Sequence, residues 1–200
     1  DEGMQIEPIN YVPVIPMVLV NGCQGIGTGW STDIPNFNPL DIINNIYNYI
    51  NDIDFKEMKP YYRGFEGIIK KDNDSKNYIS KGVFEIKGNK LIIKELPIGV
   101  WTDKYKEFLE SICVDNKIKS KKQIIRYYNS YSTDTKIHFE LFMDIDYLSS
   151  LNKEEIEKTF KLTSSINITN MVLYNADTTI NKYSSVLDIL KDFCVVRLDL

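Results

Sequence analysis

The chain has 200 residues, a hydrophobic content of 43% and a net charge of −4. This length is enough for a folded core, and a charged fraction of 26% argues against both a disordered tail and a membrane protein. On net charge alone, an acidic chain is a poor candidate for nucleic-acid binding. Three cysteines without a CxxC pair and a single histidine exclude a zinc ribbon and a histidine-based catalytic triad.

The charge is distributed unevenly along the chain. Residues 1–60 carry 2 basic and 8 acidic side chains, residues 61–136 carry 16 and 10, and residues 137–200 carry 6 and 10. The middle segment is therefore basic within an acidic whole. A run of basic residues in it can contact the phosphate backbone of a nucleic acid, or it can form a solvated helix face or loop. This basic run consists of Lys117, Lys119, Lys121, Lys122 and Arg126.

The first 39 residues hold five of the seven prolines, which predicts ordered loop and short strand rather than helix. Within them, Val14–Val20 reads as an extended run near a sheet edge. Asn38 and Pro39 then provide a cap and a first-turn proline for an amphipathic helix. The predicted apolar face of that helix comprises Ile42, Ile43, Ile46, Tyr49, Ile50 and Ile53.

Short β-rich runs separated by turns follow the first helix. Thr102 is expected to cap a second helix, and Asn152 with Glu155 predicts a capping box at the start of a third. A further helix begins near Ser184, and its apolar spacing continues without a stop signal, so we expect a piece of a longer protein. The pattern predicts an α+β fold with helices appended to antiparallel strands. The predicted extended runs are Phe65–Ile69, Val83–Ile86, Leu91–Leu96, Lys136–Met143 and Phe160–Tyr174.

The most unusual string runs from Glu7 to Thr32 and contains Gly25-Ile26-Gly27. Glycines on both sides allow the side chain of Ile26 to project outward while the backbone closes behind it. A tight turn with Ile26 in the protein core fits the same residues. The string lacks the Gly-Lys-Ser/Thr of a P-loop and the GxGxxG spacing of a dinucleotide site.

This block resembles the breakage–reunion region of type IIA DNA topoisomerases, particularly the eukaryotic topoisomerase II form. The resemblance implies the end of a winged-helix domain over 1–55, an antiparallel-sheet tower domain over 56–183 and the start of a coiled-coil arm over 184–200. Further matches occur in the family's order. They are Thr28–Ser31, Ile34–Phe37, Glu95–Pro97, Trp101–Thr102, Phe160–Leu162, Asn170–Leu173, Lys182–Tyr183 and Val186–Leu190.

The resemblance also implies residues that contact double-stranded DNA. Ile26 matches the isoleucine that intercalates between base pairs and bends the duplex. Trp101 matches a tryptophan that approaches DNA, although a half-buried aromatic side chain beside a helix start is the structural alternative. A polar stretch matches a DNA-contacting strand and loop, where uncharged groups bind phosphate oxygens; an ordinary surface loop is the alternative. This stretch consists of Lys161, Leu162, Thr163, Ser164, Ser165, Ile166, Asn167, Ile168, Thr169 and Asn170.

No catalytic residue and no metal ligand are expected within the chain. The family's nucleophilic tyrosine follows an arginine upstream of the block that begins here at Glu7-Pro8, which would place it before Asp1. The Arg126-Tyr127 pair lies in the presumed tower, and we interpret it as coincidence. Asp72–Asp74 and Asp144–Asp146 imitate a metal-binding DxD motif, but their contexts predict a turn and a strand end.

The full-length enzyme implied by the resemblance is a nuclear homodimer that uses Mg²⁺ and ATP to pass one duplex through a transient double-strand break. No membrane partner is expected. The chain alone is expected neither to cleave DNA nor to hydrolyse ATP. Two other hypotheses remain open: a structural module that braces the DNA gate of the dimer with little DNA affinity of its own, and an independent enzyme that uses Arg126-Tyr127.

Overall fold

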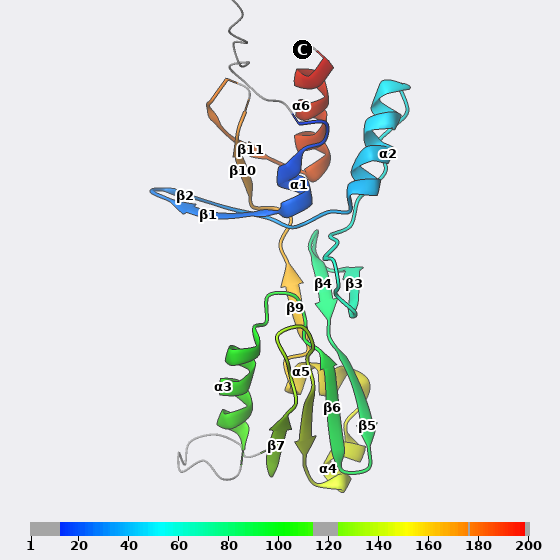
Figure 1. The fold of residues 1–200 in the computed structure, drawn as a ribbon, viewed down its shortest axis with the longest axis vertical. Helices are drawn as coiled ribbons and strands as arrows, with labels where there is room; N and C mark the ends of the chain where they lie inside the picture. The colour runs from blue at the N-terminus through cyan, green and yellow to red at the C-terminus, as the bar shows by residue number, and fades with distance from the viewer. Residues whose placement is uncertain (1–12, 114–123, 176, 199–200) are drawn as a thin grey trace, which may run out of the picture. The chain divides into compact units, whose positions relative to one another are not determined.

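The computed structural model describes residues 13–113, 124–175 and 177–198. The chain forms two compact units, of which the first comprises Asp1–Tyr62 with Asn167–Leu200 and the second Arg63–Ile166 (Figure 1). The second unit is shorter at both ends than the tower span expected from the resemblance. At its C-terminal end the difference arises because the hairpin after Asn170 contacts a strand of the first unit.

The first unit joins the two ends of the chain. Its core is a cluster of apolar side chains contributed by both segments: Leu19, Ile34, Phe37, Ile42, Met58, Met171, Tyr183, Val186, Ile189, Leu190 and Cys194. Its elements are α1 (Met17–Asn21), β1 (Cys23–Gly27), β2 (Trp30–Ile34), α2 (Pro39–Ile50), β10 (Met171–Tyr174), β11 (Ile180–Tyr183) and α6 (Val186–Leu198).

Helix α2 begins where the sequence predicts. The side chain of Asn38 accepts a hydrogen bond from the backbone N–H of Leu40, and Pro39 occupies the first turn. Its apolar face is less continuous than predicted, because Ile42 is buried while Ile50 and Ile53 are more than half exposed.

The extended run expected at Val14–Val20 is wrong in its second half, because Met17–Asn21 forms the short helix α1. The backbone N–H of Leu19 donates to the carbonyl of Pro16, and the carbonyl of Leu19 accepts from Phe37. Pro16 has an extended backbone at the N-cap, a position near the helix start that proline tolerates. A short apolar run does not by itself distinguish a strand from a buried helical turn.

The second unit contains two antiparallel sheets with helices packed beside them. One sheet has the order β3-β4-β9 and the other β5-β6-β8-β7, which confirms the predicted α+β class. The strands are β3 (Ile68–Lys71), β4 (Tyr78–Lys81), β5 (Val83–Lys87), β6 (Lys90–Glu95), β7 (Tyr127–Ser130), β8 (Phe139–Phe142) and β9 (Thr163–Ile166). The helices are α3 (Thr102–Ile112), α4 (Ile145–Ser150) and α5 (Lys153–Thr159).

Two interactions hold the elements of the second unit together, one between two helices and one between a strand and a helix. The hydroxyl of Tyr105, on α3, donates to the carbonyl of Phe160 at 2.7 Å. The ammonium of Lys81, on β4, lies 2.6 Å from Oε2 of Glu157, on α5. Glu157 is 4% exposed, so the Lys81 cation compensates a carboxylate that is withdrawn from water.

The capping box predicted at Asn152 and Glu155 is present at the start of α5. The cap of α3 differs from the prediction, because Trp101 occupies the N-cap position and makes no side-chain cap hydrogen bond. Asp144 follows β8 as a strand-end residue, but it also caps α4 by accepting from the N–H of Asp146. The sequence did not predict this short helix.

The single extended run expected over Phe160–Tyr174 is two strands, β9 and β10, which belong to different units. Asn167 interrupts the run because its side-chain oxygen accepts hydrogen bonds from both the N–H and the hydroxyl of Thr169. Such Asx turns compete with strand pairing. The lysines of the predicted basic run lie outside the described residues; its last member, Arg126, is described. In the part of the chain that the structure describes, no helix is long and apolar enough to cross a membrane.

Candidate nucleic-acid interface

Ile26 lies near the tip of the antiparallel β1–β2 hairpin, opposite Ser31. Its side chain is 94% exposed, so the interpretation that placed it in the protein core is wrong. Gly29 closes the turn with φ +84°, a backbone conformation that glycine adopts without strain. Gly27 has a different role, because a Cβ there would overlap the indole of Trp30 and force it to shift. The indole of Trp30 therefore packs on the backbone beside Ile26.

The hairpin is held from its β2 side by the polypeptide that enters β10. The N–H of Asp33 donates to the carbonyl of Asn170 at 2.8 Å, and the N–H of Val172 donates to the hydroxyl of Thr32 at 2.9 Å. The amide of Asn170 also donates to the hydroxyl of Ser31 at 3.2 Å. The structure thus joins the last residue of the predicted DNA-contacting stretch to the hairpin that carries Ile26.

Trp101 marks a second exposed surface, within the second unit. Its indole is 76% exposed and borders a pocket of about 520 Å³ whose lining includes Lys104, Lys158, Lys161 and Thr163. The ammonium of Lys161 lies 4.4 Å from the centre of the Phe108 ring. An exposed indole beside three ammonium groups is a combination suited to a phosphate backbone. Lys104 is partly neutralised, because its ammonium is 3.1 Å from the carboxylate of Glu107.

Strand β9 divides the predicted contact residues between its two faces. The side chains of Thr163 and Ser165 are exposed, as expected for groups that contact phosphate. Leu162, just before the strand, is fully buried, and Ile166 is 6% exposed, so neither side chain is available at the surface. Ser164 also points inward and donates to the carbonyl of Ile98 at 2.6 Å.

Sequence reasoning missed Lys104 and Lys158 as neighbours of Trp101. A signal for Lys104 was available, because residues three and seven positions after a helix start share one face, and Lys104 and Phe108 stand at those distances from Trp101. Lys158 was harder to find, since its placement depends on how α5 packs against the rest of the unit.

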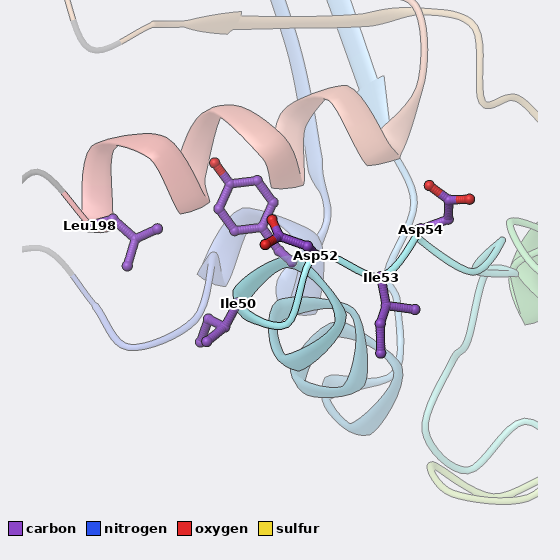
Figure 2. A pocket seen from close by; sticks show the side chains of 6 residues that line it. Ile50, Asp52, Ile53, Asp54 and Leu198 are labelled. Atoms are coloured by element: carbon purple, nitrogen blue, oxygen red, sulfur yellow. The ribbon is translucent and has the colours of Figure 1, made fainter.

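A second pocket, of about 540 Å³, lies in the first unit at the ends of α2 and α6. Figure 2 shows its lining, with Ile50 at the end of α2, Ile53 in the segment that follows it and Leu198 on the last turn of α6. Asp52 and Asp54 contribute the charged groups of this lining, and none of the described residues in it is basic. Two carboxylates without a cation repel phosphate, so this pocket is not part of the candidate interface.

The Arg126-Tyr127 pair has local structural partners. The guanidinium of Arg126 lies 3.6 Å from the carboxylate of Asp144, and the ring of Tyr127 stacks on Phe142 with centroids 4.3 Å apart. These contacts support the interpretation of the pair as coincidence. Among the described residues, no three His, Cys, Asp or Glu side chains come together as a metal site.

A sequence profile of the family described as the DNA gyrase/topoisomerase IV A subunit matches residues 1–200. The chain belongs to this family. One relative of the chain is the DNA topoisomerase 2 of Plasmodium falciparum (isolate K1 / Thailand). The two are 45% identical over 199 residues, which cover 99% of this chain and 14% of the relative. The DNA topoisomerase 2 of Penicillium chrysogenum is 41% identical over 99% of this chain and 12% of its own length.

A comparison with solved structures places the fold of this chain in the same family. The crystal structure of the Plasmodium falciparum topoisomerase II DNA-binding, cleavage and re-ligation domain matches with a TM-score of 0.88 and 45% identity, over 97% of this chain and 26% of that one. The resemblance to eukaryotic topoisomerase II is thereby confirmed. The chain spans only 12–14% of the length of the two relatives named above.

Proposed function

We propose that this chain is the DNA-binding and DNA-bending segment of the gate of an ATP-dependent type II DNA topoisomerase, in which Ile26 wedges into the duplex. The observation that carries the proposal is the 94% exposure of Ile26 on a hairpin whose backbone is held by Trp30 and Asn170. A large apolar side chain held in water on a braced hairpin is arranged to be buried by a partner.

The physics of a wedge fits this geometry. Unstacking one base step costs a few kcal/mol, which the additional contacts of a bent duplex offset. Burial of the Ile26 side chain between bases contributes to the same balance, because each apolar CH₂-sized group removed from water contributes about 0.8 kcal/mol. A β-branched side chain also has little χ1 freedom to lose on insertion.

The surface around Trp101 would position the duplex rather than read its sequence. The indole N–H of Trp101, the hydroxyls of Thr163 and Ser165 and the ammonium of Lys161 are all groups that bind phosphate oxygens. In the first unit, the amide of Asn170, held against the Ile26 hairpin, would be a further uncharged donor for phosphate beside that hairpin. A few uncharged donors of this kind bind a backbone without a high net positive charge, which accounts for a DNA partner of an acidic chain.

In this proposal the full-length enzyme is a nuclear homodimer that passes one duplex through a transient double-strand break, with Mg²⁺ and ATP bound by other segments. The part of this chain in that enzyme is to bind and bend DNA. Support comes from the relatives named above. Each is called DNA topoisomerase 2, and each is much longer than this chain.

Bending tests the wedge directly. In the full-length enzyme, Ile26→Ala removes three carbon atoms from the wedge, about 2.4 kcal/mol at 0.8 kcal/mol each, so we expect the bent complex to be about 60-fold less favoured. Fluorescence energy transfer between dyes at the two ends of a short duplex measures the bend. Ile145→Ala, which truncates an isoleucine that is 53% exposed on α4, is the matched control.

Three results would refute the proposal in different ways. If the Ile26→Ala enzyme bent DNA as well as the unaltered enzyme, Ile26 would not act as a wedge. Binding and bending that also survive Trp101→Ala would instead favour a structural module that braces the gate. A covalent DNA adduct formed by this chain alone, seen on a denaturing gel, would favour the independent enzyme.

A further inference from the structure

Two serines hold the loop that presents Trp101. We propose that Ser80 and Ser164 are positioning residues that fix Trp101 for its contact with DNA. The inference rests on the proposed function, because it concerns a tryptophan that must meet the duplex. It assigns Ser164 a role different from the direct phosphate contact that the family resemblance implies.

The two serines are cross-strand partners on β4 and β9, and their hydroxyl oxygens are 2.6 Å apart. Both form a hydrogen bond with the backbone of Ile98, in the loop between β6 and α3. The N–H of Ile98 donates to Oγ of Ser80 at 3.0 Å, and the hydroxyl of Ser164 donates to the carbonyl of Ile98 at 2.6 Å. The two side chains therefore satisfy both backbone polar groups of Ile98.

The direction of each hydrogen bond in this cluster follows from a count of hydrogens. A serine hydroxyl has one hydrogen to donate, and Ser164 uses it on the carbonyl of Ile98. The short contact between the hydroxyls must then run from Ser80 to Ser164. The result is a closed chain from the Ile98 N–H through Ser80 and Ser164 to the Ile98 carbonyl. Neither serine retains a hydrogen for a phosphate oxygen.

Ser80 and Ser164 together form a clamp on Ile98, which lies three positions before Trp101. Gly99 between them has φ +81°, and the N–H of Val100 donates to the carbonyl of Pro97 at 3.2 Å, which makes the connection a tight turn. On the other side, the carbonyl of Trp101 accepts from the N–H of Tyr105 at 2.9 Å. The hydroxyl of Tyr105 is in turn bonded to Phe160, so the backbone of Trp101 is fixed from both directions.

Strand β9 links this clamp to the exposed contact residues. Ser164 faces the loop, whereas its neighbours Thr163 and Ser165 are exposed. Trp101 and Thr163 line the same pocket. One strand therefore both carries contact residues and sets the position of the indole beside them. Such preorganisation raises affinity because less freedom is lost on binding.

The test combines DNA affinity with a direct signal from the tryptophan in the whole chain. Labelling with 5-fluorotryptophan gives one ¹⁹F resonance for Trp101 and one for Trp30, and Trp101→Phe identifies the former. We expect Ser80→Ala to shift or broaden the Trp101 resonance while the Trp30 resonance stays unchanged. DNA affinity should fall about tenfold, the effect of one lost buried hydrogen bond, with no change in the salt dependence because no charge is removed.

Ser164 supplies the matched pair of variants. Ser164→Ala should reproduce both effects, whereas Ser164→Thr keeps a hydroxyl and should preserve the resonance and the affinity. Because Ser164 is only partly buried, this pair also serves as the test if Ser80→Ala, at a fully buried position, fails to fold.

A double-mutant cycle separates the clamp from the proposed function. If the serines act through Trp101, then Ser80→Ala or Ser164→Ala should have no further effect on DNA affinity in a Trp101→Ala chain. A full additional loss there, or an unchanged Trp101 resonance in the serine variants, overturns the inference alone. An affinity that does not depend on Trp101 overturns the proposed contact and the inference together.

Discussion

Replacing Lys81 with methionine leaves the carboxylate of Glu157 in the protein interior without its cation. Glu157 is 4% exposed, and its Oε2 atom lies 2.6 Å from the ammonium of Lys81, whose side chain is 20% exposed. Removing one partner of a buried ion pair destabilises a protein by about 3–5 kcal/mol. We expect Lys81→Met to lower the free energy of unfolding of the second unit by an amount in this range.

The opposite variant should be milder. Glu157→Gln keeps an oxygen that can accept from the ammonium, and the partly exposed Lys81 can turn toward water, so a loss of about 1–2 kcal/mol is expected. The double variant Lys81→Met/Glu157→Leu replaces both charges by apolar groups and should recover most of the loss, since such replacements are often neutral.

Urea denaturation of the whole chain measures these differences. The ¹⁹F resonance of Trp101 serves as the probe of this denaturation, because this residue lies in the same unit. A larger loss for Glu157→Gln than for Lys81→Met would refute the reasoning, because the more deeply buried charge would then not be the one that needs its partner. A double variant destabilised by the sum of the single losses would refute it as well.

Three further predictions concern single residues. Asn152→Ala removes the capping box of α5 and should lower stability by about 1 kcal/mol in urea denaturation. Hydrogen bonds from Lys87 and Lys94 lower the pKa of Glu85 to about 2. Ionised Glu85 therefore stabilises the folded chain above pH 4.5, and this contribution to stability is lost as the pH falls toward 2. In acid denaturation, Glu85→Gln should lack that part of the decline in stability. Lys158→Gln should reduce the slope of log affinity against log salt by about 0.9, measured by DNA titration at several salt concentrations.

Local signals predicted the elements that depend on neighbouring residues. The start of α2 follows from Asn38 and Pro39, and the start of α5 follows from the pairing of Asn152 with Glu155, because caps act within one helical turn. The helical turn at Met17–Asn21 could not be predicted in the same way. The carbonyl of Leu19 within it is satisfied by Phe37, a residue far outside the local window.

The candidate site shows the same limit. From the residues alone, Ile26 fitted both an exposed wedge and a core position, and only the register of the hairpin decides between them. Ser164 and Thr163 are chemically similar neighbours, but the pairing of β9 with β4 sends one inward and the other outward. A shift of one residue in a strand exchanges its faces, and that register is set by contacts distant in sequence.

The arrangement of the first unit has a consequence for the order in which the chain folds. The hydrogen bond between Val172 and Thr32 closes a loop of 140 residues, and such long-range contacts slow folding. The intervening Arg63–Ile166 unit shortens this loop once it has folded, because in its sheet Ile68 and Thr163 both pair with Lys81. During synthesis, the Ile26 hairpin would thus emerge early but gain its bracing only after the second unit is complete.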